Sequence, residues 1–304
     1  MNQTVKRVLK IAGLALGAAA LTGAAYGGVQ VSQFDSSMDK VYDVPVPPIA
    51  LSTDAVVLGR GKHLVESVAP CATSLCHGHD LGGGKPIDIG PIGTFSGPNI
   101  TGANVGAAYS DGELARLIRH GLKKDGRSVR FMPAQDFAWL PDSDVTAIVS
   151  YIRSVAPVDR PNEATVVKTL GKVLDRRDQF ILDVARRIDH AKREAVPEPA
   201  PTAAYGAFVT RLCTGCHGEH LSGGHLPGAP PSIPIPLNIT PDATGLKEWT
   251  FEDFDKLMRK AIRKSGKPLD PFMPVESWRN FDDVEMHAIW AYLRTLPPTP
   301  FGGR

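Results

Sequence analysis

Cysteine and aromatic residues are scarce in this sequence, and neither sign of charge predominates. Its 304 residues include four cysteines and 7% aromatic residues, with 34 basic against 32 acidic side chains. Four cysteines are too few for a disulfide-built fold of this length, and a net charge of +2 provides no strong basic field for nucleic acid. The remaining proportions, 42% hydrophobic and 22% charged, exclude fibrous, collagenous and fully disordered chains. The length predicts about two domains.

The N-terminus combines a basic stretch with a long uncharged run. Lys6, Arg7 and Lys10 precede residues 11–34, which carry no charge. This is the layout of a secretory signal, with small residues at 22–25 as the candidate cleavage site. The run is also long enough to span a bilayer. Residues 1–34 are therefore interpreted as a signal peptide or a membrane anchor, both of which place the rest of the chain outside the cytoplasm; a buried core helix is the remaining alternative.

Proline-containing segments separate the predicted domains. The prolines within residues 44–48 favour extended backbone, so residues 35–56 are interpreted as a tether. Residues 161–202 are a predicted linker. Its residues 163–193 carry an apolar stripe at helical spacing, which predicts a helix packed across two domains or, alternatively, a docking surface for a partner or anionic headgroups. The two predicted domains are then residues 57–160 and 203–304.

An internal repeat relates these two predicted domains at a nearly constant offset. The matching tripeptides are Cys-His-Gly at 76–78 and 216–218, Asn-Ile-Thr at 99–101 and 238–240, and Phe-Met-Pro at 131–133 and 272–274. Three pairs of segments with apolar residues at helical spacing are predicted to be helices: residues 59–68 and 204–212, 111–122 and 250–262, and 143–155 and 282–296. Because no segment shows strand-like alternation, the body is predicted to be all-α with long Gly/Pro loops.

The second cysteine pair has the spacing of a covalent haem-attachment site. Cys213 and Cys216 are separated by two residues, and His217 follows directly, which is the pattern C-x-x-C-H. Cysteines three apart on a helical turn share one face and can bond to the two vinyl groups of one porphyrin. The adjacent histidine can then bind the iron. A disulfide and a zinc site are the alternatives, although zinc normally recruits four nitrogen or sulfur ligands.

The first cysteine pair departs from this pattern because four residues separate Cys71 from Cys76, which His77 follows. The repeat places Thr73 where the first cysteine of the usual motif stands. A second haem site is predicted, with the two extra residues bulging outward. Attachment through Cys76 alone and a Cys71–Cys76 disulfide without haem remain alternatives.

Methionine is the predicted ligand on the opposite side of each iron. Met132 follows His77 at almost the same separation along the chain as Met273 follows His217, and each methionine stands in a Phe-Met-Pro segment. Proline prevents regular helix, so each methionine is expected on a loop that can reach the iron. A thioether opposite histidine raises the reduction potential of a haem. Asn99/Thr101 and Asn238/Thr240 are predicted to stabilise nearby loops through hydrogen bonds.

On these motifs, over residues 57–157 and 204–298, the chain resembles dihaem c-type cytochromes, and is similar to the cytochrome subunits of bacterial periplasmic dehydrogenases. The resemblance implies two tandem class I cytochrome c domains, each with one covalent haem c and His/Met iron. It further implies single-electron transfer between an exported or membrane-bound donor, such as a dehydrogenase, and a respiratory acceptor. The expected location is the periplasm, with the N-terminal helix as a tether to the inner membrane. A haem enzyme, such as a dihaem peroxidase or a thiosulfate-oxidising cytochrome, is the alternative function.

Overall fold

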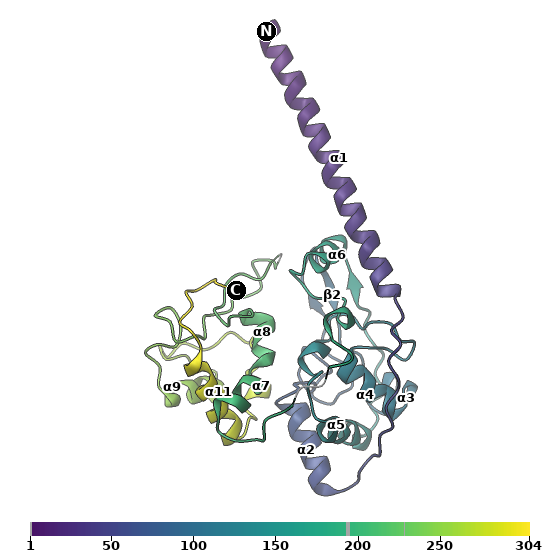
Figure 1. Cartoon of the computed structure of the whole chain (residues 1–304), viewed down its shortest axis with the longest axis vertical. Coiled ribbons are helices and arrows are strands. Elements are labelled where there is room, and N and C mark those ends of the chain that lie inside the picture. Colours follow the sequence, from purple (N-terminus) through teal and green to yellow (C-terminus); the bar gives the residue numbers. More distant parts are fainter. Residues whose placement is uncertain (1, 193–194, 228) are drawn as a thin grey trace.

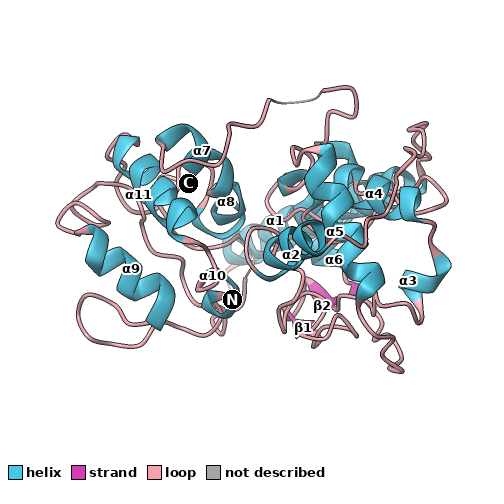
Figure 2. Cartoon of the chain, turned by 90° about the horizontal axis from the view of Figure 1, so that it is seen from below, coloured by secondary structure: helices cyan, strands magenta, loops and turns pink. Residues whose placement is uncertain are grey.

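The computed structural model describes residues 2–192, 195–227 and 229–304 and is mostly helical. A long N-terminal helix projects from two helical bodies that lie side by side, the first half (residues 40–192) and the second half (residues 203–304) (Figures 1 and 2). The helices of the first half are α2 (Ala55–Glu66), α3 (Val105–Ala108), α4 (Asp111–His120), η1 (Ala134–Asp136), α5 (Asp142–Ser154), α6 (Thr169–Arg176) and η2 (Ala185–Arg187). Those of the second half are α7 (Ala203–Val209), α8 (Arg211–His217), α9 (Phe251–Lys260), α10 (Val275–Trp278) and α11 (Asp283–Thr295).

Helix α1 (Gln3–Asp39) is long and apolar enough to cross a membrane, with a mean hydropathy of 1.7 over its most apolar 18 residues. That stretch is not buried against the rest of the protein, and Figure 1 shows the helix extending away from both bodies. The other end is docked: Phe34 and Met38 are buried in a small apolar cluster of the first half, and Asp35 pairs with Lys172 at 2.6 Å. The helix continues beyond the predicted start of the tether, so its free part and its docked part form one continuous rod.

The two halves share one helix-crossing geometry. In the first half α2 crosses α5 at Gly61, where a Cβ atom would lie 2.0 Å from the carbonyl oxygen of Ala147. In the second half α7 crosses α11 at Gly206, where a Cβ atom would lie 1.9 Å from the carbonyl oxygen of Ala288. Ala147 and Ala288 are equivalent positions of the repeat. Glycine is required at both crossings because the helix backbones touch.

Side-chain caps begin several of these helices where the sequence places small polar residues. Ser110, Thr250 and Asp282 each accept a bond from a backbone N–H in the first turn, and an acidic residue three positions later completes a capping box. Helix α5, the counterpart of α11 in the first half, instead starts after Pro141 without a side-chain cap.

The body is mostly helical, as predicted, and departs from the predicted secondary structure in two places. The helix predicted over residues 163–193 is confined to α6 and the single turn η2, and α6 packs against α1 instead of bridging the two halves. The body is also not entirely helical, because β1 (Ile87–Asp88), β2 (Gly93–Phe95) and β3 (Val166–Val167) form a small antiparallel sheet. These strands have two or three residues each, too short to produce a visible alternation of apolar and polar residues.

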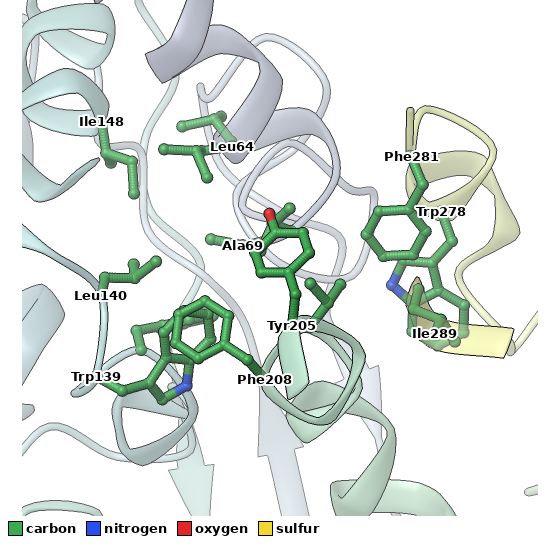
Figure 3. Packing of buried hydrophobic residues seen from close by; sticks show 14 of the residues in the cluster. Leu64, Ala69, Trp139, Leu140, Ile148, Tyr205, Phe208, Trp278, Phe281 and Ile289 are labelled. Atoms are coloured by element: carbon green, nitrogen blue, oxygen red, sulfur yellow. The ribbon is translucent and has the colours of Figure 1, made fainter. Parts of the chain in front are cut away.

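One hydrophobic core runs through both halves and across the seam between them. In Figure 3, Trp139 and Leu140 of the first half face Phe208 and Tyr205 of the second, and the Trp139 and Phe208 rings meet edge to face at 62°. A polar contact also crosses the seam: His63 Nε2 lies 2.9 Å from Oε1 of Glu285, whose side chain is only 1% exposed. The two halves therefore pack directly against each other through both apolar and polar contacts.

Candidate functional site

The second cysteine motif lies on α8, which starts directly after α7. The helix places Cys213 and Cys216 one turn apart and ends at His217, which is buried. His217 Nδ1 lies 2.7 Å from the carbonyl oxygen of Leu237. Because a carbonyl only accepts hydrogen bonds, Nδ1 carries the proton and Nε2 keeps its lone pair. Burial lowers the pKa of His217, which favours the neutral imidazole that binds metal.

An apolar pocket adjoins this motif, with about 530 Å³ of space that includes the solvent at its opening. Cys213, His217 and Met273 all contribute to its lining, although the methionine lies far from the other two in the sequence. The other walls are apolar side chains, including Leu246, Phe254, Met258 and Trp278. A cysteine, a neutral histidine and a methionine around an apolar space fit a covalently attached haem with His/Met iron.

Met273 lies on a turn, as predicted. Pro274 has φ −76° and ψ 56°, outside the helical region, and the N–H of Val275 donates to the carbonyl oxygen of Met273 at 2.7 Å. In the first half Pro133 has nearly the same conformation, φ −79° and ψ 57°, and Ala134 donates to Met132. Both methionines are half-buried against the core. The two Met-Pro turns therefore share one backbone conformation, whereas the preceding Phe131 has a left-handed φ of 67° that Phe272 does not share.

The first histidine is oriented like the second. His77 Nδ1 lies 2.8 Å from the carbonyl oxygen of Pro98, so its Nε2 is also left as the metal-binding atom, and burial lowers its pKa. Pro98 and Leu237 each immediately precede the asparagine of an Asn-Ile-Thr segment. Sequence reasoning missed these two orienting carbonyls, although the repeat contained the signal.

The four residues between the cysteines of the first motif form a compact series of turns instead of a helix. The N–H of His77 reaches back to the carbonyl oxygen of Cys71 at 3.0 Å, and the N–H of Cys76 bonds to both Thr73 oxygens, Oγ1 at 3.2 Å and the carbonyl at 3.1 Å. Burial raises the pKa of the Cys76 thiol, and the nearby charge of Glu276 from the second half adds to this rise. The segment is held in these turns with Thr73 buried, and Glu276 of the second half lies close to it.

The alternatives of a disulfide and a zinc site find no support in the described part of the chain. All four cysteines are free thiols there. Burial raises the pKa of both Cys71 and Cys213 to about 12, so both thiols are protonated at neutral pH. Within the same residues, neither cysteine motif belongs to a group of side chains spaced to hold a cation.

The paired Asn-Ile-Thr segments make the hydrogen bonds predicted for them, in duplicate. Asn99 Oδ1 accepts from the N–H and the hydroxyl of Thr101 at 3.0 and 2.7 Å, and Asn238 does the same with Thr240 at 2.9 and 2.8 Å. The Asn99 amide donates to Val158 and the Asn238 amide to Thr299, both at 2.7 Å. All four Asn and Thr side chains of the two motifs are buried. They tie the loop that orients each histidine to the chain that follows α5 or α11.

Comparison with known proteins identifies part of the chain. Residues 202–297, which make up most of the second half, match the family Cytochrome c. Similar proteins include the cytochrome c subunit of a quinone alcohol dehydrogenase from Gluconacetobacter polyoxogenes, 39% identical over 94 residues. The fructose dehydrogenase cytochrome subunit of Gluconobacter japonicus is 31% identical over 112 residues, and the gluconate 2-dehydrogenase cytochrome c subunit of Pantoea cypripedii is 40% identical over 95 residues.

These matches cover a limited part of each protein. They extend over 29%, 32% and 29% of this chain, and over 20%, 23% and 21% of the respective relatives. The matches show that part of this chain is similar to cytochrome c. The relatives are named as cytochrome subunits of dehydrogenases.

Proposed function

We propose that the chain is a dihaem c-type cytochrome that carries single electrons from a dehydrogenase to a respiratory acceptor. The observation that carries the proposal is the duplicated histidine geometry, with Nδ1 of His77 and of His217 each held by a backbone carbonyl. The crossings at Gly61 and Gly206 and the two Asn-Thr hydrogen-bond sets support two tandem class I cytochrome c domains.

In this proposal the residues of the chain bind and insulate two haem groups. Cys71 and Cys76 form the thioether bonds of the first, and Cys213 and Cys216 those of the second. His77 and Met132 would hold one iron, and His217 and Met273 the other. The bound haems would supply one-electron redox chemistry. The apolar walls exclude water, and the methionine ligands favour a high reduction potential.

The partners and the location follow from the same proposal. The relatives are named as subunits of dehydrogenases, so we propose that the donor is a dehydrogenase subunit and the acceptor another redox protein. We further propose that the protein functions in the periplasm, and that α1 holds it at the inner membrane.

The test is the intact mass of the exported holoprotein combined with its optical spectrum. The proposal expects the mass of two covalent haems and a methionine–iron charge-transfer band of full strength for two haems. The Cys71→Ala/Cys76→Ala double variant should lose one haem, and Cys213→Ala/Cys216→Ala the other. A mass with one haem in the wild type would refute the dihaem proposal, and a high-spin ferric haem with peroxide turnover would indicate an enzyme instead.

A further inference from the structure

Glu276 of the second half contacts the irregular cysteine loop of the first. It lies on α10, three residues after Met273. Its Oε1 accepts hydrogen bonds from the backbone N–H and the hydroxyl of Ser74, at 3.1 and 3.2 Å. Its Oε2 lies 3.6 Å from Nε2 of His79. One carboxylate therefore contacts the chain on both sides of Cys76.

Ser74 is one of the four residues that separate Cys71 from Cys76. In the turns of this loop its carbonyl oxygen accepts from Lys85 at 2.8 Å, while its N–H and hydroxyl point to Glu276. The repeat that aligns Thr73 with Cys213 aligns Ser74 with Thr214, whose hydroxyl donates to the carbonyl oxygen of Arg211. The hydroxyl of Ser74 and its N–H are instead directed to Glu276 of the second half.

Helix α10 is itself fixed on both sides. Trp278 lines the apolar cavity of the second site. On the other side, Ser277 Oγ and Asn280 Nδ2 both donate to the carbonyl oxygen of Glu66, at the end of α2 in the first half. The segment that follows the Met273 turn therefore contacts the first half through Ser277 and Asn280. It contributes Trp278 to the wall of the cavity in the second half.

We infer that Glu276 is a positioning residue of the first haem site, which holds the Cys71–Cys76 loop from the opposite half and lowers the reduction potential of the haem attached there. This inference rests on the proposed function. A carboxylate beside the attachment loop favours the ferric form, because that form carries one more positive charge. The side chain is 39% exposed, so water weakens this effect without abolishing it.

The experiment is a spectroelectrochemical titration of the full-length holoprotein and its variants. Glu276→Gln keeps the shape of the side chain and removes its charge, and should raise the midpoint potential of the first haem and leave that of the second unchanged. Ser74→Ala removes one of the two donors and should give a smaller shift in the same direction. Met132→His, which lowers the potential of the first haem, assigns the two midpoints.

Asp255→Asn is the matched control, because it neutralises a carboxylate of similar exposure, 34%, that pairs with Arg259 on α9. It should leave the first midpoint unchanged. Equal first midpoints in Glu276→Gln, Asp255→Asn and the wild type would overturn the inference while leaving the proposed function intact. If Glu276→Gln does not fold, an unchanged first midpoint in Ser74→Ala would overturn it. A wild type that carries no haem on Cys71 and Cys76 would instead refute the dihaem proposal.

Discussion

At the scale of single residues, side chains at equivalent positions of the two halves make equivalent hydrogen bonds. A histidine donates Nδ1–H to a carbonyl, and a buried asparagine fixes the loop that supplies this carbonyl. The duplication distinguishes these residues from neighbours of the same type. Met258 also lines the second cavity, but it projects from α9, whereas Met273 lies on a turn stabilised by proline.

Replacement of Met273 by leucine should remove one iron ligand and little else. The expected result is loss of about half of the methionine–iron charge-transfer intensity and a lower midpoint for one haem, because the thioether no longer favours the ferrous state. The measurement is the ferric spectrum of the oxidised holoprotein. Met258→Leu makes the same change of side chain as Met273→Leu, at another position that is buried. It should leave the charge-transfer band intact and lower the free energy of unfolding by less than about 1.5 kcal/mol. Equal loss in both variants would contradict the assignment.

At the scale of helices, close backbone contact determines where small residues are needed. Helix α2 contains two glycines in different surroundings, because Gly61 faces α5 at contact distance and Gly59 has open space where a Cβ would lie. Substitution of Gly61 therefore tests the packing of α2 on α5, and substitution of Gly59 tests the intrinsic helix preference of the residue alone.

Gly61→Ala should destabilise the first half, because its Cβ would overlap the Ala147 carbonyl oxygen at 2.0 Å and force α2 away from α5. We expect a loss of about 1–3 kcal/mol, the usual cost of overpacking. Gly59→Ala should instead stabilise by about 0.5–1 kcal/mol, because alanine is the better helix former. Urea unfolding followed by circular dichroism measures both. A stabilising Gly61→Ala would show that the helices do not cross as described.

Helices α2 and α11 also meet across the seam, through His63 and Glu285. The hydrogen bond to Glu285 raises the pKa of His63 despite its partial burial, while Arg60 opposes the rise and Asp282 supports it. Protonated His63 therefore stabilises the folded state fully below its unfolded pKa of about 6.5, and this contribution is lost as the pH rises through the higher folded value.

The free energy of unfolding of the wild type should thus fall between pH 6 and pH 9 more than that of His63→Gln, which cannot ionise. Urea midpoints at the two pH values measure the difference. His287→Gln serves as the control, because it removes an exposed histidine whose Nδ1 bonds to the carbonyl oxygen of Asp283 within α11 and whose ring stacks on Phe251 of the same half. Identical pH dependence in His63→Gln and the wild type would exclude a stabilising ion pair across the seam.

At the scale of the whole molecule, sequence reasoning succeeded where a signal was long or occurred twice. The paired helices and the Asn-Thr hydrogen bonds were predictable because the periodicity or the motif recurs at a fixed offset. The small sheet was not, since strands of two or three residues have no period to detect. The helix predicted over residues 163–193 failed because its apolar residues are buried by different elements, with Leu174 against α1 and Val184 beside Gly121. The seam contacts of His63 and Glu276 join residues far apart in the chain, which no local pattern reveals.

The continuity of α1 gives the last prediction, which concerns where anchoring ends and folding begins. Residues 3–26 are exposed along the free part of the helix, whereas Phe34 and Met38 are buried in the cluster that also contains Ile92 and Leu174.

A variant in which a cleavable secretory signal replaces residues 2–26 should leave the membrane fraction and keep its stability to unfolding. Extending the replacement through residue 39 should destabilise the first half by about 3–6 kcal/mol, because two buried side chains contribute about 1.5–3 kcal/mol each. Membrane fractionation and urea unfolding measure the two effects separately. Retention of the shorter variant in washed membranes would show that another surface binds the bilayer or a membrane partner, and equal stability of the two variants would show that the docked turns of α1 do not support the fold.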